Sequence, residues 1–328
     1  METIVVSASE VKELLPMDEC IDVMARALET LGRGKGINPL RSGMFLPEDI
    51  GLLGLMPSYL ADPPAVGIKV VTVFPGNHGT EFDSHQGAVL LFDMEHGSLR
   101  AIIDASSITA IRTAAVSGLA TRLLAREDAD DLALLGTGVQ ACTHLEAMLA
   151  VRPLRRVRAW SPTPERLARF AERESARHGI DVEATASAEE AVRGADIICT
   201  VSSARQPILL GEWLQPGAHI NAAGSSVKST RELDTAAVVM SRLFVDRRES
   251  TLNEAGDFLF PKQEGAIDDD HIKGEIGEIL LGECDGRRSD EEITLFKSLG
   301  LGVEDLAAAH HIYRRALDRG VGVRSEFG

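Results

Sequence analysis

Residues 131–150, DLALLGTGVQACTHLEAMLA, contain the stretch that decides the fold of this chain. A short apolar run ends at GTGVQA, and a helical pattern of apolar residues begins directly after it. A strand, a glycine turn and a helix in this order are typical of a dinucleotide-binding βα unit, with a coincidental glycine-rich loop as the alternative. The next strand-like run, at residues 156–160, favours the dinucleotide unit.

The residue types in this turn each have a physical reason. Gly136 permits a tight turn, Gly138 lets a pyrophosphate approach the backbone, and Ala141 lets the helix pack close to the strand. The phosphates are expected at the free N–H groups and the positive dipole end of the helix that starts near Val139. The predicted phosphate site consists of Gly136, Thr137, Gly138, Val139, Gln140 and Ala141.

The length and composition narrow the class of protein. The 328 residues are enough for two domains. The 34 Lys and Arg against 50 Asp and Glu give a formal net charge of −16, so nucleic acid and anionic membranes are not expected as partners. The 4 cysteines lack the C-x-x-C spacing of zinc sites, so we expect no metal and a reducing, cytoplasmic compartment. Neither a membrane span nor a signal peptide is predicted.

The pattern of strands and helices changes at the glycine turn. Before it, short strand-like runs and a hairpin at residues 87–103 predict an α+β domain with mostly antiparallel strands. After it, strands alternate with helices, which predicts a parallel sheet covered on both faces. The predicted fold class is therefore α/β, with a Rossmann-type doubly wound parallel sheet and an additional α+β domain. The last helical pattern, at residues 303–319, is expected to return to the first domain, so we predict one domain of residues 1–112 plus 303–328 and another of residues 113–302.

Three cations of the first domain stand out because their surroundings are apolar or neutral. Arg41 lies between two strand-like runs, Lys69 interrupts a buried strand predicted at residues 66–74, and Arg112 lies on the edge of a helix predicted at residues 106–125. Each of them can extend to solvent or pair with an acid. Lys69 is the hardest to explain in this way, because a buried ammonium without a partner is very costly.

Several stretches together resemble the ornithine cyclodeaminase/μ-crystallin family. The resembling segments are KVVTVFPGN at 69–77, HQG at 85–87, IIDA at 102–105, ITAIRTAA at 108–115, the glycine turn, NAAG at 221–224, RELD at 231–234 and EAGD at 254–257. The resemblance implies a homodimer in which the first domain binds substrate and dimerises, while a Rossmann domain binds a nicotinamide cofactor. Family members include cyclodeaminases, alanine dehydrogenases, ketimine reductases and related imino-acid reductases, so the family alone does not name the reaction.

The resemblance places Arg41, Lys69 and Arg112 where the family holds the α-carboxylate of the substrate. A guanidinium fits a carboxylate with two parallel hydrogen bonds, and a lysine adds a charge that can polarise an imine. Asn77 and His85 are further candidates for the substrate pocket. For His85, a purely structural hydrogen bond is an equal alternative.

Two departures from the cyclodeaminase pattern point to the reaction. The resemblance implies an acidic residue in the Leu-Met-Pro segment and an aspartate after the NAAG stretch, and this chain has Gly54 and Ser226 there. Without these carboxylates there is no evident base to take a proton from an α-ammonium. The ketimine-reductase branch is similar to this chain at both positions. We therefore favour hydride transfer to a preformed C=N bond, with Lys69, Ser226 or a water stabilising or supplying the proton.

The cofactor prediction rests on the ends of the parallel strands. The nicotinamide is expected between Gly224-Ser225-Ser226 and the carboxylate site, and Val201, Ser202 and Ala223 are further predicted cofactor-binding residues. An acidic residue about 20 positions past the glycines would bind the ribose of NAD. This chain instead has Ser161 and Thr163, with Arg166 a turn later, and these can bind a 2′-phosphate. We predict NADP(H) over NAD(H), although dual use stays open and Arg166 is alternatively an ordinary solvated helix residue.

The predicted function is an NAD(P)H-dependent reductase that converts a small 2-imino acid to the L-amino acid. The substrate is a cyclic ketimine such as Δ1-pyrroline-2-carboxylate, or a linear imine such as iminosuccinate or that of pyruvate. One alternative is ornithine cyclodeaminase, which forms proline and ammonia from ornithine. Another is a non-catalytic, crystallin-like protein that binds NADPH, against which the three cations argue.

Overall fold

The computed structural model describes residues 2–77 and 80–326. Its contacts divide the chain into two units, of which one combines Met1–Arg112 with Leu301–Gly328 and the other contains Thr113–Gly300. The chain thus returns to the first unit at Leu301, two residues before the expected position. The mixed α/β fold with a parallel sheet is confirmed.

The first unit is built on an eight-stranded sheet with the order β16-β1-β7-β6-β5-β4-β2, in which β3 also pairs with β4, and is here called the substrate unit after the role predicted for it from the sequence. Its neighbours are antiparallel except for β1 and β7, which are parallel. The strands are β1 (Glu2–Val6), β2 (Gly36–Ile37), β3 (Ser42–Phe45), β4 (Leu52–Ala61), β5 (Pro64–Val73), β6 (His85–Phe92), β7 (Leu99–Asp104) and β16 (Val323–Glu326). The helices are α1 (Ala8–Leu14), α2 (Met17–Gly32), the first part of α3 (Ala105–Leu124) and α11 (Gly302–Arg319).

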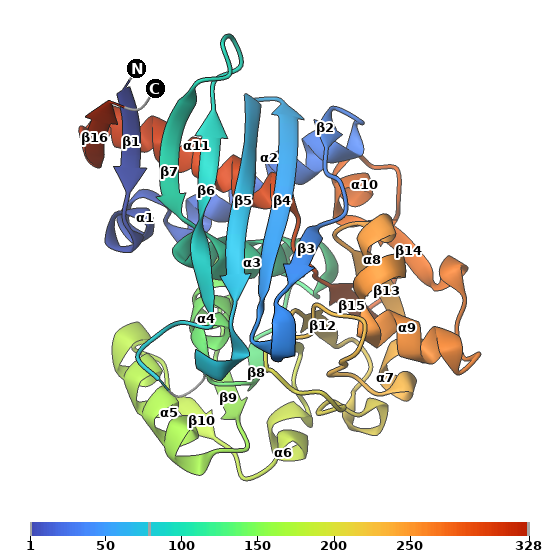
Figure 1. Cartoon of the computed structure of the whole chain (residues 1–328). Helices are drawn as coiled ribbons and strands as arrows, with labels where there is room; N and C mark the ends of the chain where they lie inside the picture. The colour runs from blue at the N-terminus through green and yellow to red at the C-terminus, as the bar shows by residue number, and fades with distance from the viewer. Residues whose placement is uncertain (1, 78–79, 327–328) are drawn as a thin grey trace. The chain divides into compact units, whose positions relative to one another are not determined.

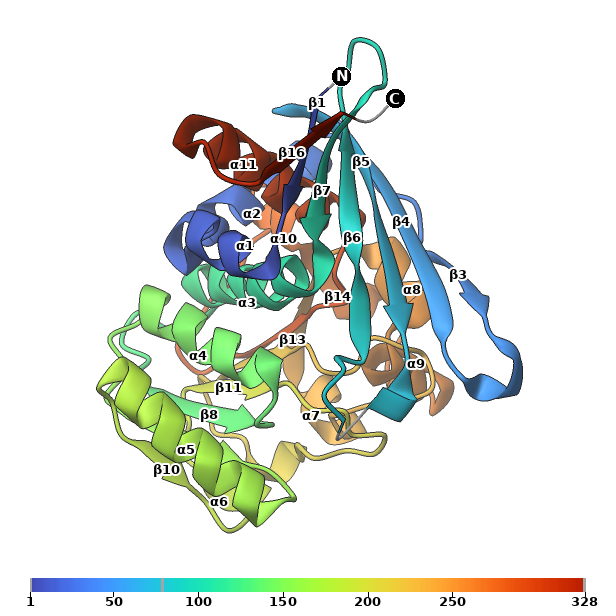
Figure 2. The ribbon, with the colours of Figure 1, turned by 60° about the vertical axis from the view of Figure 1, so that its left-hand side comes forward.

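The two faces of this sheet differ in exposure. Alternate residues of the long central strands, such as Met56, Lys69 and Val89, are buried on the face that α2 and α11 cover (Figure 1). In the turned view, these two helices lie on the same side of the strands (Figure 2). The period-2 pattern leaves the intervening side chains on the opposite face, where they are half-buried or exposed.

The opposite face, here called the open face, carries a continuous apolar row. Pro57, Ile68, Leu90, Ile102 and Val5 are successive register neighbours on β4, β5, β6, β7 and β1. A contiguous apolar surface of this kind is typical of a protein contact rather than of a solvated sheet.

The second unit, here called the nucleotide unit, has an eight-stranded sheet with the order β10-β9-β8-β11-β12-β15-β13-β14, whose pairs are all parallel. Its strands are β8 (Asp131–Leu135), β9 (Arg156–Trp160), β10 (Val182–Ala184), β11 (Ile197–Thr200), β12 (His219–Ala222), β13 (Ser241–Val245), β14 (Ile272–Glu275) and β15 (Ile293–Lys297). The helices are α4 (Val139–Val151), α5 (Pro164–His178), α6 (Ala188–Val192), α7 (Thr235–Val239), α8 (Arg248–Glu254), α9 (Gly256–Gln263) and α10 (Ile276–Leu280).

Two strands of this sheet were not predicted. β15 lies between β12 and β13, so it is an interior strand, and β14 forms the edge beyond β13. Strand order reverses between β8 and β11, which follow each other in the sheet but not in the chain. Ligands of open parallel sheets bind outside the carboxyl ends of the strands at such a reversal.

Within residues 2–77 and 80–326, none of the helices combines the length and the apolar character that a membrane crossing requires. The same residues contain no group of three or more His, Cys, Asp or Glu side chains placed to hold a metal ion.

Candidate active site

The glycine turn after β8 has the geometry that a pyrophosphate requires. Gly136 has a positive φ of 134°, and a Cβ there would lie 2.7 Å from the carbonyl oxygen of Val201. Gly138 precedes α4, and a Cβ on it would meet no atom of the described residues within 4 Å. The first-turn amides of a helix have no acceptor within the helix. The turn therefore leaves open space beside the first-turn amides of α4, and this fits a dinucleotide phosphate.

The other predicted residues of this turn differ in exposure. Val139 is 63% exposed, whereas Ala141 is fully buried where α4 packs on the sheet. Thr137 and Gln140 are half-buried. A phosphate near α4 thus meets mainly backbone, as expected for this kind of turn.

The carboxyl ends of β11 and β12 are joined by a buried carboxylate that the sequence analysis did not single out. Glu232 accepts hydrogen bonds from the amide and the hydroxyl of Ser202, both at 2.7 Å. It also accepts from the hydroxyl of Thr200 at 2.9 Å and from the amides of Gly224 at 2.9 Å and Ser225 at 3.2 Å. Burial, followed by the nearby charge of Asp257, raises the pKa of Glu232. Three of the predicted cofactor residues, Ser202, Gly224 and Ser225, are therefore held by the chain itself.

A second buried pair supports this carboxylate. Lys297, at the end of β15, lies 2.9 Å from a carboxylate oxygen of Asp257 and donates to the carbonyl oxygens of Ala222 and Ser225. Asp257 accepts from the amides of Glu232 at 2.8 Å and Leu233 at 3.0 Å. We call Glu232, Asp257 and Lys297 the loop-holding network, because together they fix the loops that follow β11 and β12.

The predicted ribose-binding residues lie at the end of β9. Ser161 and Thr163 are half-buried, and Arg166 is exposed in the first turn of α5. Thr163 is the N-cap residue of α5, but its side chain makes no cap hydrogen bond to the helix. The positive end of a 15-residue helix therefore lies beside two hydroxyl groups and a guanidinium.

The substrate unit contains a buried cluster of opposite charges. Lys69, from β5, lies 3.2 Å from Oδ1 of Asp305 and donates to the hydroxyl of Thr109 at 2.6 Å. Arg112, from α3, donates from Nε to Oδ1 of Asp305 at 2.9 Å and from Nη1 to Oε2 of Glu304 at 2.7 Å. Lys69, Arg112, Glu304 and Asp305 are all at least 96% buried. We call these four residues the charge cluster.

The cluster places Lys69 in an unusual electrostatic setting. Burial is the largest cause that lowers its pKa, to about 8, and the charges of Arg112 and Arg41 lower it further. Asp305 acts in the opposite direction. A lysine in this range exchanges its proton near neutral pH, which is the condition for general acid–base work.

The two acids of the cluster were not predicted. Pairing with acids was one predicted alternative for the three cations, and the structure shows such pairing for Lys69 and Arg112. The available signal was two adjacent acids in the first turn of α11. This signal is weak, because acids are ordinary near a helix N-terminus.

Two further predicted substrate residues make local contacts. The Asn77 amide donates to the carbonyl oxygen of Asp83 at 3.0 Å, which closes the loop before β6. The exposed His85 has Nδ1 at 3.0 Å from the hydroxyl of Ser84. The contact of His85 is the structural hydrogen bond that was the alternative for this residue, and a substrate role of Asn77 and His85 stays a prediction. Ser226 is half-buried directly after Ser225.

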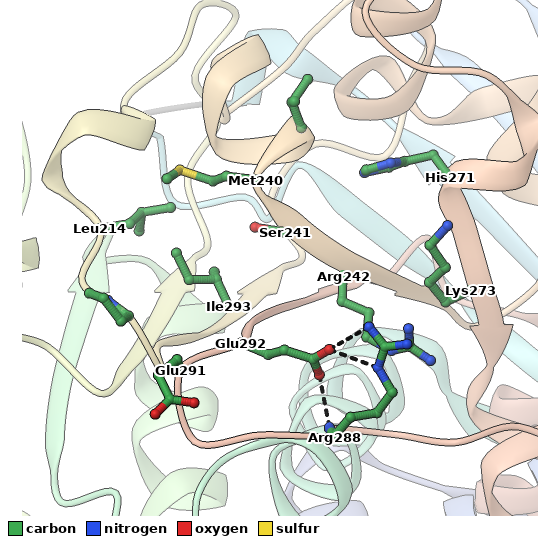
Figure 3. A pocket seen from close by; sticks show the side chains of 12 residues that line it. Leu214, Met240, Ser241, Arg242, His271, Lys273, Arg288, Glu291, Glu292 and Ile293 are labelled. Carbon is green, nitrogen blue, oxygen red and sulfur yellow. Dashed lines mark hydrogen bonds and ion pairs between the residues drawn. The ribbon is translucent and has the colours of Figure 1, made fainter.

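A groove of about 550 Å³ lies at the amino ends of β13 and β15, away from the carboxyl ends that hold the glycine turn (Figure 3). Its cations already bind partners in the chain. Arg288 donates to Glu292 at 2.8 Å, and Arg242 donates to the carbonyl oxygens of Gly286 and Asp285. His271 lies 2.9 Å from the carbonyl oxygen of Val238. Arg242, His271 and Arg288 of the groove are therefore engaged within the chain.

Comparisons with known proteins agree with this geometry. The model of the ornithine cyclodeaminase/mu-crystallin family matches residues 1–320. Δ1-pyrroline-2-carboxylate reductase of Bacillus cereus is 39% identical over 325 residues, which cover 99% of this chain and 100% of the relative. Ketimine reductase mu-crystallin of Mus musculus is 42% identical over 311 residues, which cover 94% of this chain and 95% of the relative.

A solved structure agrees along nearly the whole chain. Δ1-pyrroline-2-carboxylate reductase of Thermococcus litoralis, in complex with NADH and L-proline, has a TM-score of 0.95 and 39% identity, and the match covers 98% of this chain and 99% of that one. The turn after β8, the parallel sheet and this extent of likeness lead to one assignment. The chain belongs to the ornithine cyclodeaminase/mu-crystallin family.

Proposed function

We propose that this protein is an NAD(P)H-dependent reductase that converts a small 2-imino acid to the corresponding L-amino acid. The observation that carries the proposal is the buried pair of Lys69 and Arg112, two cations that share the carboxylate of Asp305. The reductases named above, which resemble the chain over nearly its full length, support the same reaction. Imino acids that contain a carboxylate fit this pair, with a cyclic ketimine such as Δ1-pyrroline-2-carboxylate as the first candidate.

In the proposed reaction, the arginines bind the substrate and Lys69 holds the proton. The nicotinamide, when bound, supplies a hydride to the imine carbon. Arg112 and Arg41 hold the α-carboxylate, because a guanidinium presents paired donors to it. Lys69, with its pKa near 8, holds a proton close to the imine nitrogen, so that the nitrogen is cationic when the carbon accepts the hydride. The product is a secondary or primary amine in which the former C=N carbon carries the new hydrogen.

Ornithine cyclodeaminase activity is the second candidate, and one position argues against it. Gly54 is buried on β4 opposite Val71, on the same face of the sheet as Lys69. An acid at this position would face the side on which Lys69 lies, but glycine offers neither a base nor an anion for a second amine.

The test is reduced-nicotinamide oxidation with preformed cyclic imines and with 2-oxo acids plus ammonia or methylamine. We expect oxidation that depends on the imine. Ammonia release from ornithine without such oxidation would favour the cyclodeaminase instead. Tight NADPH binding with no turnover of any substrate would favour a non-catalytic binding protein.

For the cofactor we propose a preference for NADP(H), with NAD(H) also used. Ser161, Thr163 and Arg166 support binding of a 2′-phosphate, and residues 160–163 at the end of β9, where the acid that binds the ribose of NAD is expected, include no acidic residue. The relative solved with NADH is a reason to expect use of both cofactors. The ratio of kcat/KM for NADPH and NADH measures the preference.

We also propose that the protein is a homodimer that buries the open face. A two-fold interface brings the same patch of both copies together, and the apolar row from Pro57 to Val5 suits such a self-complementary contact. Ile68→Glu should give a monomer in light scattering. Met240→Glu, at a 48% exposed apolar position in the other unit, should leave the dimer intact. A monomeric wild type would refute this proposal.

The compartment proposed is a reducing one, as in the cytoplasm. Cys20, Cys142, Cys199 and Cys284 are all free thiols. Free thiols are typical of proteins that remain in reducing compartments. Fractionation of cells that express the protein tests this location.

A further inference from the structure

We infer that Asp305 is a positioning residue for the reaction, which orients Lys69 and Arg112 as one group and keeps Lys69 charged at the pH at which the enzyme works. This inference rests on the proposed function, and it gives a role to a residue that has none in the proposed reaction. Asp305 lies in the first turn of α11, a helix whose sequence pattern indicates only packing.

The geometry shows one carboxylate shared by two cations. Oδ1 of Asp305 accepts from Nζ of Lys69 at 3.2 Å and from Nε of Arg112 at 2.9 Å, and Oδ2 lies 3.5 Å from Nη2 of Arg112. The three residues belong to β5, α3 and α11, and are 193 and 236 positions apart in the chain. A single side chain therefore sets the relative placement of the two groups proposed to hold the substrate.

The hydrogen bonds of Lys69 leave one direction for the substrate. One N–H of the ammonium is directed to Thr109, whose own hydroxyl proton is donated to the carbonyl oxygen of Ala105 at 2.6 Å. A second N–H is directed to Asp305. An ammonium has three donors, and the third meets no acceptor within residues 2–77 and 80–326. The contacts with Thr109 and Asp305 thus fix the direction of two N–H groups of Lys69, and thereby limit the direction of the third.

The charges that act on Lys69 come from α11, α3 and the segment before β3, whereas its register neighbours on β4 and β6 are the apolar Met56 and Val89. Asp305 of α11 faces it as an anion, while Arg112 of α3 and Arg41 of the segment before β3 face it as cations. Glu304, the neighbour of Asp305, pairs with Arg112. Burial and the two arginines favour the neutral amine, and Asp305 opposes them. Loss of the Asp305 charge therefore lowers the pKa of Lys69 below about 8.

The experiment uses the full-length protein labelled with carbon-13 at the lysine Cε, with Lys69→Met to assign the resonance. In the wild type, Lys69 should titrate near 8, well below the ordinary value of 10.5. Asp305→Asn keeps the size of the side chain and removes its charge, so the titration should move lower by about one pH unit or more. Asp305→Glu restores the charge and should move it back towards the wild type.

Glu304→Gln is the matched control. It removes a buried carboxylate from the same turn of α11, but one that pairs with Arg112. We expect a smaller movement of the Lys69 titration than in Asp305→Asn. If the Lys69 titration moves equally in the two variants, the total charge of the cluster sets the pKa of Lys69 rather than the contact with Asp305. This outcome would overturn the inference.

Activity provides the second readout. With preformed imine, the alkaline fall of kcat/KM should follow the Lys69 titration and occur at lower pH in Asp305→Asn, with partial rescue in Asp305→Glu. A purely structural role would lower activity at all pH values without moving the profile, and this outcome refutes the inference.

If the wild type does not reduce imines, the proposed function fails, whereas the NMR titration still tests the role of Asp305. A wild-type Lys69 that titrates near 10.5 refutes the inference without any variant.

Discussion

Each unit of this protein buries a network of charges, and the two networks satisfy their charges differently. In the charge cluster of the substrate unit, carboxylates pair with side-chain cations. In the loop-holding network of the nucleotide unit, Glu232 and Asp257 accept mainly from backbone amides and hydroxyls. A buried ion pair changes the proton affinity of its members, whereas a carboxylate that accepts amides fixes the path of the backbone. The first network therefore suits reactive groups and the second suits the shape of a binding loop.

The largest effect is expected where a cation is removed from the charge cluster. Arg112→Ala leaves Glu304 and Asp305 buried without their guanidinium, so the free energy of unfolding should fall by about 3–5 kcal/mol. Urea denaturation measures this loss. Arg100→Ala is the control, because Arg100 forms a partly exposed pair with Asp93 and should cost less than about 1 kcal/mol. Similar losses in both variants would show that the cluster has no special energetic role.

The next effect concerns His144, a buried histidine of the nucleotide unit that is neutral at pH 7. His144 contacts the Ser117 hydroxyl at 2.9 Å and the Gln140 carbonyl at 2.7 Å, and burial lowers its pKa from 6.5 to about 4. Because the folded-state pKa is depressed, stability present above pH 6.5 should be lost as the pH falls towards 4, by about 3 kcal/mol. When denaturation is measured at a series of pH values, the free energy of unfolding should fall less steeply with decreasing pH in His144→Gln than in the wild type. An unchanged slope would mean that other groups dominate.

A smaller effect should follow from a near-isosteric change in the loop-holding network. Glu232→Gln replaces one acceptor oxygen with an N–H donor that faces other donors, so the loops after β11 and β12 lose a hydrogen bond worth about 1.5–3 kcal/mol. Affinity for NADH, followed by fluorescence titration, should fall about tenfold or more. The control Glu264→Gln, at an exposed pair with Arg231, should leave it unchanged. Normal affinity in Glu232→Gln would separate the network from cofactor binding.

The smallest effect is expected at an exposed cation. Arg166→Ala should weaken NADPH by less than about tenfold, since a solvated charge pair is worth about 1 kcal/mol or less, and should leave NADH unaffected. The ratio of the two Kd values is the measurement. A loss shared by both nucleotides would place Arg166 away from the 2′-phosphate, and would support its reading as an ordinary surface residue.

The sequence permits prediction of features that have a local signature. The glycine turn at Gly136 and Gly138, and the alternation of strands and helices after it, predict the parallel sheet of the nucleotide unit. β15 was missed because its five residues follow a charged loop and end in Lys297, so neither length nor flanking pattern marks an interior strand. Its place in the sheet results from pairing with strands far away in the sequence.

The same distinction applies to the site. Lys69 stands out because a charge interrupts an apolar strand, and this is visible within a few residues. Its partner Asp305 lies 236 positions away and looks like any acid at a helix start. Glu232 was missed for the same reason, because the groups that donate to it come from the ends of separate strands. Partners defined by tertiary contact leave no periodic pattern in the sequence.

The discontinuous course of the substrate unit has a consequence for how the protein is made. β5 and α3 are synthesised early, but α11, which carries Glu304 and Asp305, follows the entire nucleotide unit. Until it emerges from the ribosome, Lys69 and Arg112 have no counter-ions from this helix, and the sheet lacks one of its covering helices. The intervening unit is contiguous in sequence, and such domains generally fold as units during synthesis. Assembly of the charge cluster is therefore expected among the last steps of folding.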